Sequence, residues 1–98
     1  WLIIKLGKKG FLTKAEVDTA FFKGNYPESC SIQAINTNDI SKVKDENWLT
    51  IIPKSILYAD KVHKFSINAK FHSTEFSHVK LNIFPDGGVS RLRIFGHI

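Results

Sequence analysis

Methionine is absent from this 98-residue chain, cysteine occurs once, and no hydrophobic run approaches the length of a membrane-spanning helix. Such a helix needs ~20 consecutive apolar residues, so we expect no membrane partner. The single Cys30 excludes an internal disulfide and a cysteine-cluster zinc site, and it favours a reducing, intracellular location, the cytoplasm. The apolar start at residues 1–6 is too short for a signal peptide. Because the chain opens at Trp1 within this apolar run, we expect a piece of a longer protein.

Short motifs for metal, phosphate or nucleophilic chemistry are also missing. The histidines are His63, His72, His78 and His97, and no two of them have the short spacing of a metal-binding pair. No serine lies in a G-x-S-x-G turn, and no glycine-rich loop leads into a helix. We therefore predict no cofactor and assign no metal ligand, while the metal requirement stays open.

The formal net charge is +5, but the lysines are scattered along the chain. Only Lys8 and Lys9 are adjacent, and single lysines are typical of the solvent-facing side of β-proteins. The interleaved aromatic and basic residues of a single-strand binder are missing as well. We therefore expect no nucleic-acid partner.

Alternating apolar and polar residues recur between clusters of Gly, Pro, Asn and Asp. This pattern predicts about seven strands, at residues 1–6, 13–19, 29–36, 48–52, 64–69, 78–84 and 90–95. Turns are expected at residues 7–10, 24–27, 36–39, 53 and 86–88. Short strands without a long helix favour one all-β domain over residues 1–98, an antiparallel β-sandwich or jelly roll.

The most informative segment is F-P-D-G-G-V-S-R-L-R-I-F-G at residues 84–96. Its proline and glycines predict a tight turn before a strand. On that strand Arg91 and Arg93 share one face, while Leu92 and Ile94 share the other. Paired guanidinium groups beside a turn are suited to hold a carboxylate or another planar, oxygen-rich group.

A second cluster, E-V-D-T-A-F-F-K-G-N, occupies residues 16–25. Glu16 and Asp18 share one strand face, as general acid and base chemistry requires. The plainer interpretation is that they form the solvated side of the strand. Gly24 and Asn25 form either an ordinary loop or a turn through which the backbone approaches a small polar ligand. His63 is either a general base or, as the lone histidine before an apolar strand, a hydrogen-bond donor at its edge.

Together these segments resemble the allantoicase family, hydrolases of purine breakdown. The resemblance rests on W-L-I-I-K-L-G at residues 1–7, the cluster at residues 16–25, S-I-Q-A at residues 31–34, and H-V-K-L-N-I-F-P-D-G-G-V-S-R-L-R-I-F-G at residues 78–96. Trp48 and His63 also match in order. These pieces cover nearly the whole chain, and the two longest are the most specific.

The resemblance implies a galactose-binding-like jelly roll and hydrolysis of allantoate to ureidoglycolate and urea. It covers the later two-thirds of one of two similar repeats, so it implies a second repeat as partner and a homo-oligomer. The upstream G-W-E-x-R-R type motif of the family is missing from these residues, which therefore represent an incomplete domain.

The two clusters supply a hypothesis for the site. Allantoate carries a carboxylate and two ureido groups, so it needs cationic forks and hydrogen-bond acceptors. Arg91 or Arg93 would hold the carboxylate, and Asp18 or Glu16 would accept ureido protons or act as the base toward a water. Asn25 and the amides of Gly87 and Gly88 would orient an oxygen. The predicted catalytic residues are Glu16, Asp18 and His63, and the predicted substrate-binding residues are Thr19, Asn25, Asp86, Gly87, Gly88, Arg91 and Arg93.

Other functions remain open at this point. The same fold hosts non-catalytic modules that bind a carbohydrate, a small acid or a partner protein. A purely structural repeat that stabilises an oligomer is a third possibility. For the arginines, the plainer interpretation is an exposed ion pair with Glu16 or Asp18, worth at most about 1 kcal/mol.

Overall fold

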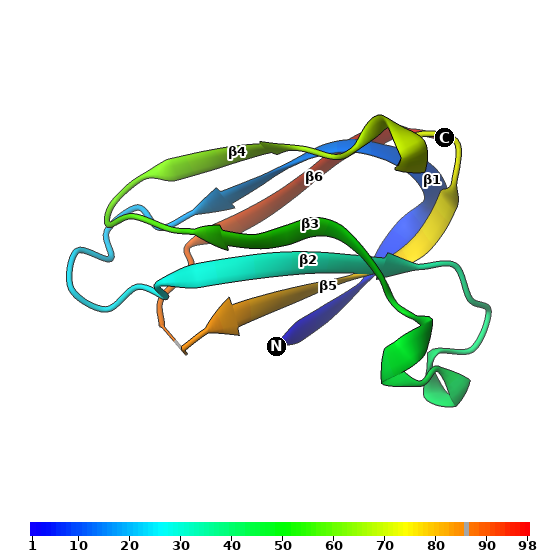
Figure 1. The fold of residues 1–98 in the computed structure, drawn as a ribbon, viewed down its shortest axis with the longest axis horizontal. Helices are drawn as coiled ribbons and strands as arrows, with labels where there is room; N and C mark the ends of the chain where they lie inside the picture. Colours follow the sequence, from blue (N-terminus) through cyan, green and yellow to red (C-terminus); the bar gives the residue numbers. More distant parts are fainter. Residues whose placement is uncertain (86) are drawn as a thin grey trace.

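The computed structural model describes residues 1–85 and 87–98 and consists of antiparallel β-strands joined by loops (Figure 1). The strands within the described residues are β1 (Leu2–Asp18), β2 (Ser29–Ile35), β3 (Leu49–Ile56), β4 (Val62–Ser66), β5 (Glu75–Phe84) and β6 (Arg91–His97). Short 3-10 helices lie between β2 and β3, at η1 (Ile40–Lys42) and η2 (Asp45–Asn47), and between β4 and β5, at η3 (Ala69–Phe71). Among the described residues, no helix has the length and apolar character needed to cross a membrane.

The long strand β1 belongs to two layers of the sandwich. Its first half pairs with β5. On its other side β5 pairs with β2, and β2 in turn pairs with β3. Its second half lies between β4 and β6. The pairing register with β5 shifts between Lys5 and Gly10, and the register with β6 shifts between Leu12 and Lys14. Strands that change layer through such irregularities form the corners of β-sandwiches, so the predicted antiparallel all-β sandwich is confirmed.

Two predicted turns are wrong. Residues 7–10 do not separate two strands, because β1 runs through them and only its register against β5 shifts there. The second is Pro53, which lies inside β3 and not in a turn. Since β3 is an edge strand that pairs only with β2, a residue without an N–H is tolerated on its exposed side.

The core lies between the inner faces of the two layers. β1 contributes Ala15 and Val17 from its second half, and β6 adds Leu92 and Ile94 as partly buried neighbours. The opposite layer contributes Cys30, Ile32, Ala34, Val79 and Leu81. Cys30 is fully buried in this core, and burial raises the pKa of its thiol to about 11.

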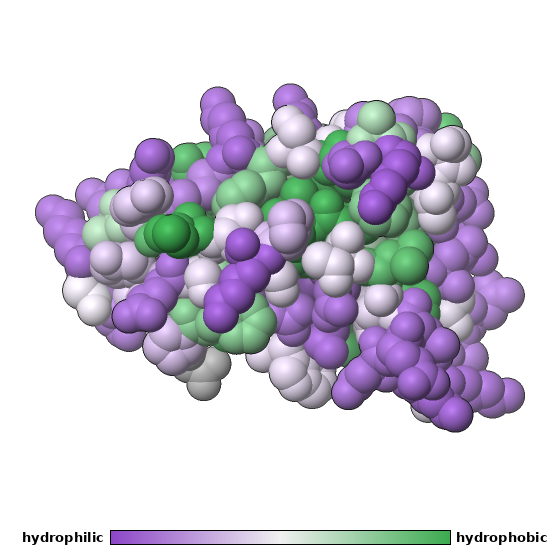
Figure 2. Space-filling model, viewed as in Figure 1, coloured by the Kyte–Doolittle hydropathy of each residue, from purple (hydrophilic) through white to green (hydrophobic). Residues whose placement is uncertain are grey.

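Alternation along β6 follows the predicted pattern. Leu92 and Ile94 pack against the core, whereas Arg91 and Arg93 are exposed on the opposite face. The same alternation in β1 buries Val17 and leaves Glu16 and Asp18 on the outer face. Hydrophilic side chains also gather over the connection between β2 and β3, at the lower right of Figure 2.

Gly96 is required where β6 ends against β1. It lies opposite Leu12 in the ladder, and a Cβ at this position would overlap the carbonyl oxygen of Phe11. We expect Gly96→Ala to lower the free energy of unfolding by about 1–3 kcal/mol, because the two backbones must separate. Chemical denaturation measures this change.

Gly7→Ala is the matched control, because a Cβ there meets no atom within 4 Å. We expect it to change the free energy of unfolding by less than about 0.5 kcal/mol. Equal losses in both variants would contradict the close approach of β6 to β1.

Candidate functional site

The loop at residues 19–28 and the start of β6 lie at one end of the sandwich, on the left of Figure 1. The connection at residues 19–28 meets the connection between β3 and β4 through the hydrogen bond from Thr19 N to Lys61 O, at 2.9 Å. It meets the described residues between β5 and β6 through the bond from Gly88 N to Asn25 O, at 2.8 Å. Segments more than 60 residues apart are therefore held together by backbone hydrogen bonds.

Charged side chains face each other across β1 and β6 on the outer face of the sandwich. Asp18 lies opposite Arg91, and Glu16 lies opposite Arg93. Val62 of β4 borders the same space, a cavity of about 200 Å³ that we call the charged pocket. Its lining residues are Glu16, Asp18, Val62, Arg91 and Arg93. The structure thus brings together four of the predicted site residues.

The ion pair within the charged pocket is weak. Arg93 Nη1 lies 3.9 Å from Glu16 Oε2, with the two side chains 51% and 17% exposed. That distance is too long for a hydrogen bond, and partly exposed pairs contribute little stability. Among the described residues, no carboxylate lies within salt-bridge distance of the Arg91 guanidinium. None of the described carboxylates therefore neutralises the Arg91 guanidinium.

Asp18 closes the turn that follows β1. Its Oδ1 accepts a hydrogen bond from Ala20 N at 2.8 Å, and its backbone oxygen accepts from Ser90 N at 2.8 Å. Ser90 Oγ adds a bond to Ala20 O at 2.8 Å. Sequence reasoning missed this role of Ser90, whose only signal was its place directly before the arginine strand. These bonds fix the start of β6 beside the end of β1.

Thr19 is buried and connects two loops. Its Oγ1 donates to Tyr58 O at 2.6 Å and accepts from Lys61 N at 3.1 Å. The contacts that the structure gives Thr19 therefore position the loop between β3 and β4. Substrate contact by Thr19 stays a prediction.

Close packing explains the paired glycines. A Cβ on Gly88 would overlap the ring of Phe22, and one on Gly87 would lie 2.6 Å from the backbone of Tyr26 and Pro27. The Gly88 amide already donates to Asn25 O, so it is engaged within the fold. Its predicted contact with a substrate oxygen would require this bond to open. The neighbouring Asp86, also predicted to bind substrate, lies outside the described residues.

His63 lies on the inner face, opposite Val17, and is only 7% exposed. Its Nε2 accepts from Tyr58 N at 2.8 Å, and its Nδ1 lies 3.0 Å from Val17 O. A neutral ring protonated at Nδ1 satisfies both contacts. Glu16 and Asp18 project from the other face of β1, so the structure does not bring His63 to the charged pocket. These contacts agree with the strand-edge interpretation, and the role as base stays a prediction.

Among the described residues, no group of three or more His, Cys, Asp or Glu side chains is placed to hold a metal ion. The chemistry that the charged pocket offers directly is recognition of an anionic, hydrogen-bonding molecule by guanidinium and carboxylate groups.

Comparison with known proteins gives one consistent family. The family profile described as "Allantoicase: Allantoicase repeat" matches residues 1–98. An allantoicase of Dictyostelium discoideum is 47% identical over 97 residues, which is 96% of this chain and 26% of that protein. A probable allantoicase of Rhizobium meliloti (strain 1021) is 42% identical, over 100% of this chain and 31% of that protein.

Solved structures agree with these relatives. A structure described as that of allantoicase aligns with a TM-score of 0.81 and 35% identity, covering 98% of this chain and 27% of its own. The allantoicase crystal structure from Saccharomyces cerevisiae aligns with a TM-score of 0.80 and 36% identity, covering 97% and 26%. The chain therefore spans roughly a quarter to a third of the proteins it matches.

The buried hydroxyl of Thr19 provides a test of how the loops are held. We expect Thr19→Val to lower the free energy of unfolding by about 1–3 kcal/mol, because Lys61 N and Tyr58 O lose their partner. Thr50→Val on the exposed face of β3 is the control and should change stability by less than about 0.5 kcal/mol. Equal unfolding midpoints for the two variants would show that the hydroxyl does not hold these loops.

Proposed function

This chain belongs to the allantoicase family, and from that membership we propose that it forms part of an enzyme that hydrolyses allantoate to ureidoglycolate and urea. The observation that supports this proposal most directly is the pairing of Asp18 with Arg91 and of Glu16 with Arg93 in one pocket. Allantoate carries one carboxylate and two ureido groups, which require cationic donors and anionic acceptors at the same place.

Each side of the charged pocket has a role in this proposal. Arg91 binds the substrate carboxylate, because no carboxylate of the described residues lies within salt-bridge distance of it, and Arg93 assists from the same face. Glu16 or Asp18 accepts the ureido N–H groups, or takes a proton from the attacking water. Asp18 Oδ1 already accepts from Ala20 N, so the turn limits how its carboxylate rotates.

The other predicted site residues belong to the same proposal. Thr19, Asn25, Asp86, Gly87 and Gly88 complete the proposed substrate-binding set. His63 acts as a base in this proposal only if its ring gives up one of its two present contacts. A second allantoicase repeat, a homo-oligomer and a cytoplasmic location complete it, the last because a single buried cysteine suits a reducing compartment.

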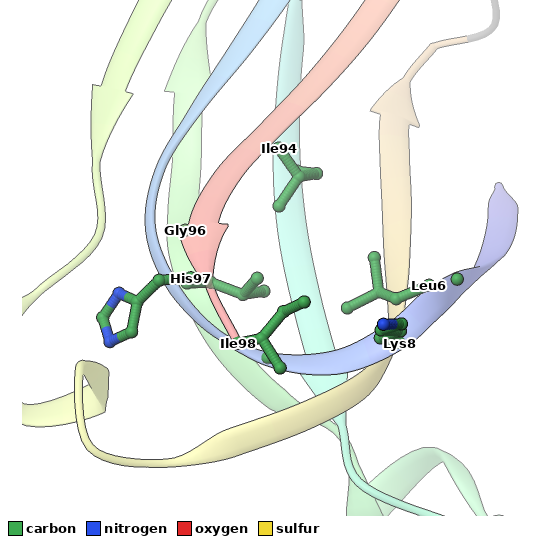
Figure 3. A pocket seen from close by; sticks show the side chains of 9 residues that line it. Leu6, Lys8, Ile94, Gly96, His97 and Ile98 are labelled. Atoms are coloured by element: carbon green, nitrogen blue, oxygen red, sulfur yellow. The ribbon is translucent and has the colours of Figure 1, made fainter.

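Incompleteness of the domain is also part of the proposal. Among the described strands, β6 and the first half of β1 each lack a partner on one side. Between them lie cavities of about 510 and 500 Å³, which we call the open seam. Leu6, Ile94 and Ile98 border one of them (Figure 3). We propose that a further strand of the longer protein covers this apolar surface, because unpaired edges favour strand addition.

The catalytic proposal predicts the effect of removing one guanidinium. In the longer protein that contains these residues, we expect Arg91→Gln to lower kcat/KM for urea release from allantoate at least tenfold, because a charge-assisted contact to the carboxylate is lost. Steady-state assays of urea release measure this effect. Lys42→Gln, which also removes one exposed positive charge but lies at the other end of the sandwich, should leave kcat/KM unchanged.

Unchanged kcat and KM in Arg91→Gln would remove this residue from the site. If the unsubstituted chain releases no urea and instead binds a sugar saturably, the non-catalytic alternative holds.

The open seam makes a separate prediction for backbone hydrogen exchange. In the longer protein, we expect the β6 amides that face away from β1 to exchange slowly, because a covering strand accepts their hydrogen bonds. In residues 1–98 alone, the same amides should exchange rapidly. The outer edge of β3 is the internal control, since the proposal adds no strand there. Rapid exchange of the β6 amides in both samples would refute the covering strand.

A further inference from the structure

A second charged pocket is lined by the bend of β1 and the connection that follows β2. These segments lie on the right of Figure 1, whereas the end of β1 and the start of β6 lie on the left. The pocket has a volume of about 390 Å³. The side chains that concern us are Lys5, Lys8, Lys9, Asp39, Ser77 and His78. We call this space the lysine pocket. It shares no residue with the charged pocket.

His78 forms part of the floor of the lysine pocket and is only 6% exposed. Its Nδ1 lies 2.8 Å from Ser77 Oγ, which also accepts a hydrogen bond from Thr37 N at 2.8 Å. This chain of contacts fixes the orientation of the ring. Among the described residues, Nε2 of His78 makes no hydrogen bond, yet no fully buried side-chain nitrogen or oxygen there lacks a partner. Nε2 is therefore not fully buried, and His78 lines this pocket.

Three lysines line the same pocket as this ring. Lys5 lies directly opposite His78 in the ladder between β1 and β5. Lys9 Nζ donates to Asn38 Oδ1 at 3.0 Å, so it closes the pocket against the connection after β2. The acidic group in the lining is Asp39, whose Oδ1 already accepts from Ser41 N at 3.0 Å. Among the described lining residues, three lysines thus outnumber one carboxylate, and Oδ1 of that carboxylate already accepts a hydrogen bond from its own loop.

We propose that the lysine pocket binds a small oxyanion, a carboxylate or a phosphate group, between His78 Nε2 and the ammonium group of Lys5. A lysine ammonium is a point charge that pairs with either kind of oxyanion, and a protonated imidazole adds a directional donor. The two pockets lie at opposite ends of the molecule, so this site is distinct from the proposed catalytic one and does not depend on it.

Protonation of His78 couples binding to pH. Burial, and then the charge of Lys5, lower the pKa of His78 below its usual value. A bound anion favours the charged ring and so raises that pKa, which means that binding takes up a proton and strengthens as pH falls. The charged groups facing the ring are Lys5, Lys8 and Lys9 from β1 and Asp39 from the connection. Of these groups and His78, only the histidine has an ordinary titration range near neutral pH.

Nuclear magnetic resonance of the full chain tests this proposal. The imidazole signal of His78, assigned by its loss in His78→Gln, is followed during titration with inorganic phosphate and, separately, with acetate. We expect a saturable shift of the signal, with a half-saturating anion concentration that falls as pH is lowered. Tighter binding of phosphate identifies a phosphorylated ligand, and tighter binding of acetate identifies a carboxylate.

Matched lysine variants separate a built site from general charge attraction. We expect Lys5→Gln to raise the half-saturating concentration about tenfold, as loss of one charge-assisted contact predicts. Lys23→Gln removes the same charge at the other end of the molecule and should leave the concentration unchanged. Lys5 is exposed, so its substitution leaves the core intact, and Lys9→Gln gives an independent second variant.

Absence of a saturable His78 shift with either anion would overturn the proposal. So would equal weakening in Lys5→Gln and Lys23→Gln. Either result is read at His78 itself and leaves the proposed hydrolysis of allantoate untouched, since that activity is measured by urea release and by Arg91→Gln.

Discussion

The arrangement of this molecule depends on the pairing of β1 with strands of both layers. The first half of β1 pairs with β5, and its second half pairs with β4 and β6. The strand bends where its register shifts, so it connects the two sheets without leaving the hydrogen-bonded ladders. Both pockets use this strand. Glu16 and Asp18 stand near its end, and Lys5 and Lys9 stand beside its bend.

Core packing determines which way the charged side chains of the site point. Ala15 and Val17 are buried between the layers, so Glu16 and Asp18 must face outward. A slip of one residue against β6 would move the whole apolar set to the solvent side, and the cost of that exposure holds the register. Arg91 therefore stays opposite Asp18 because of hydrophobic burial. The neighbouring ion pair between Arg93 and Glu16, at 3.9 Å, is too weak to hold the register.

Loop packing at this end of the sandwich gives several predicted site residues a structural role. Thr19 holds the loop after β3, and Gly88 admits the ring of Phe22. His63 uses both ring nitrogens beneath the outer face that bears the carboxylates. These contacts keep the charged side chains in position, although Thr19, Gly88 and His63 do not themselves line the charged pocket. The family motif thus combines residues that would contact a ligand with residues that keep those side chains in position.

Local pattern in the sequence determined the all-β class and the opposite faces of Arg91 and Leu92, because side-chain direction in a strand alternates with a period of two. The sequence motifs also identified the allantoicase family. Only the tertiary structure decided that residues 7–10 continue β1, that Pro53 lies within an edge strand and that Asp18 meets Arg91. Each of these depends on which distant strand becomes the partner, and period-two alternation specifies a face of the strand but not its neighbour.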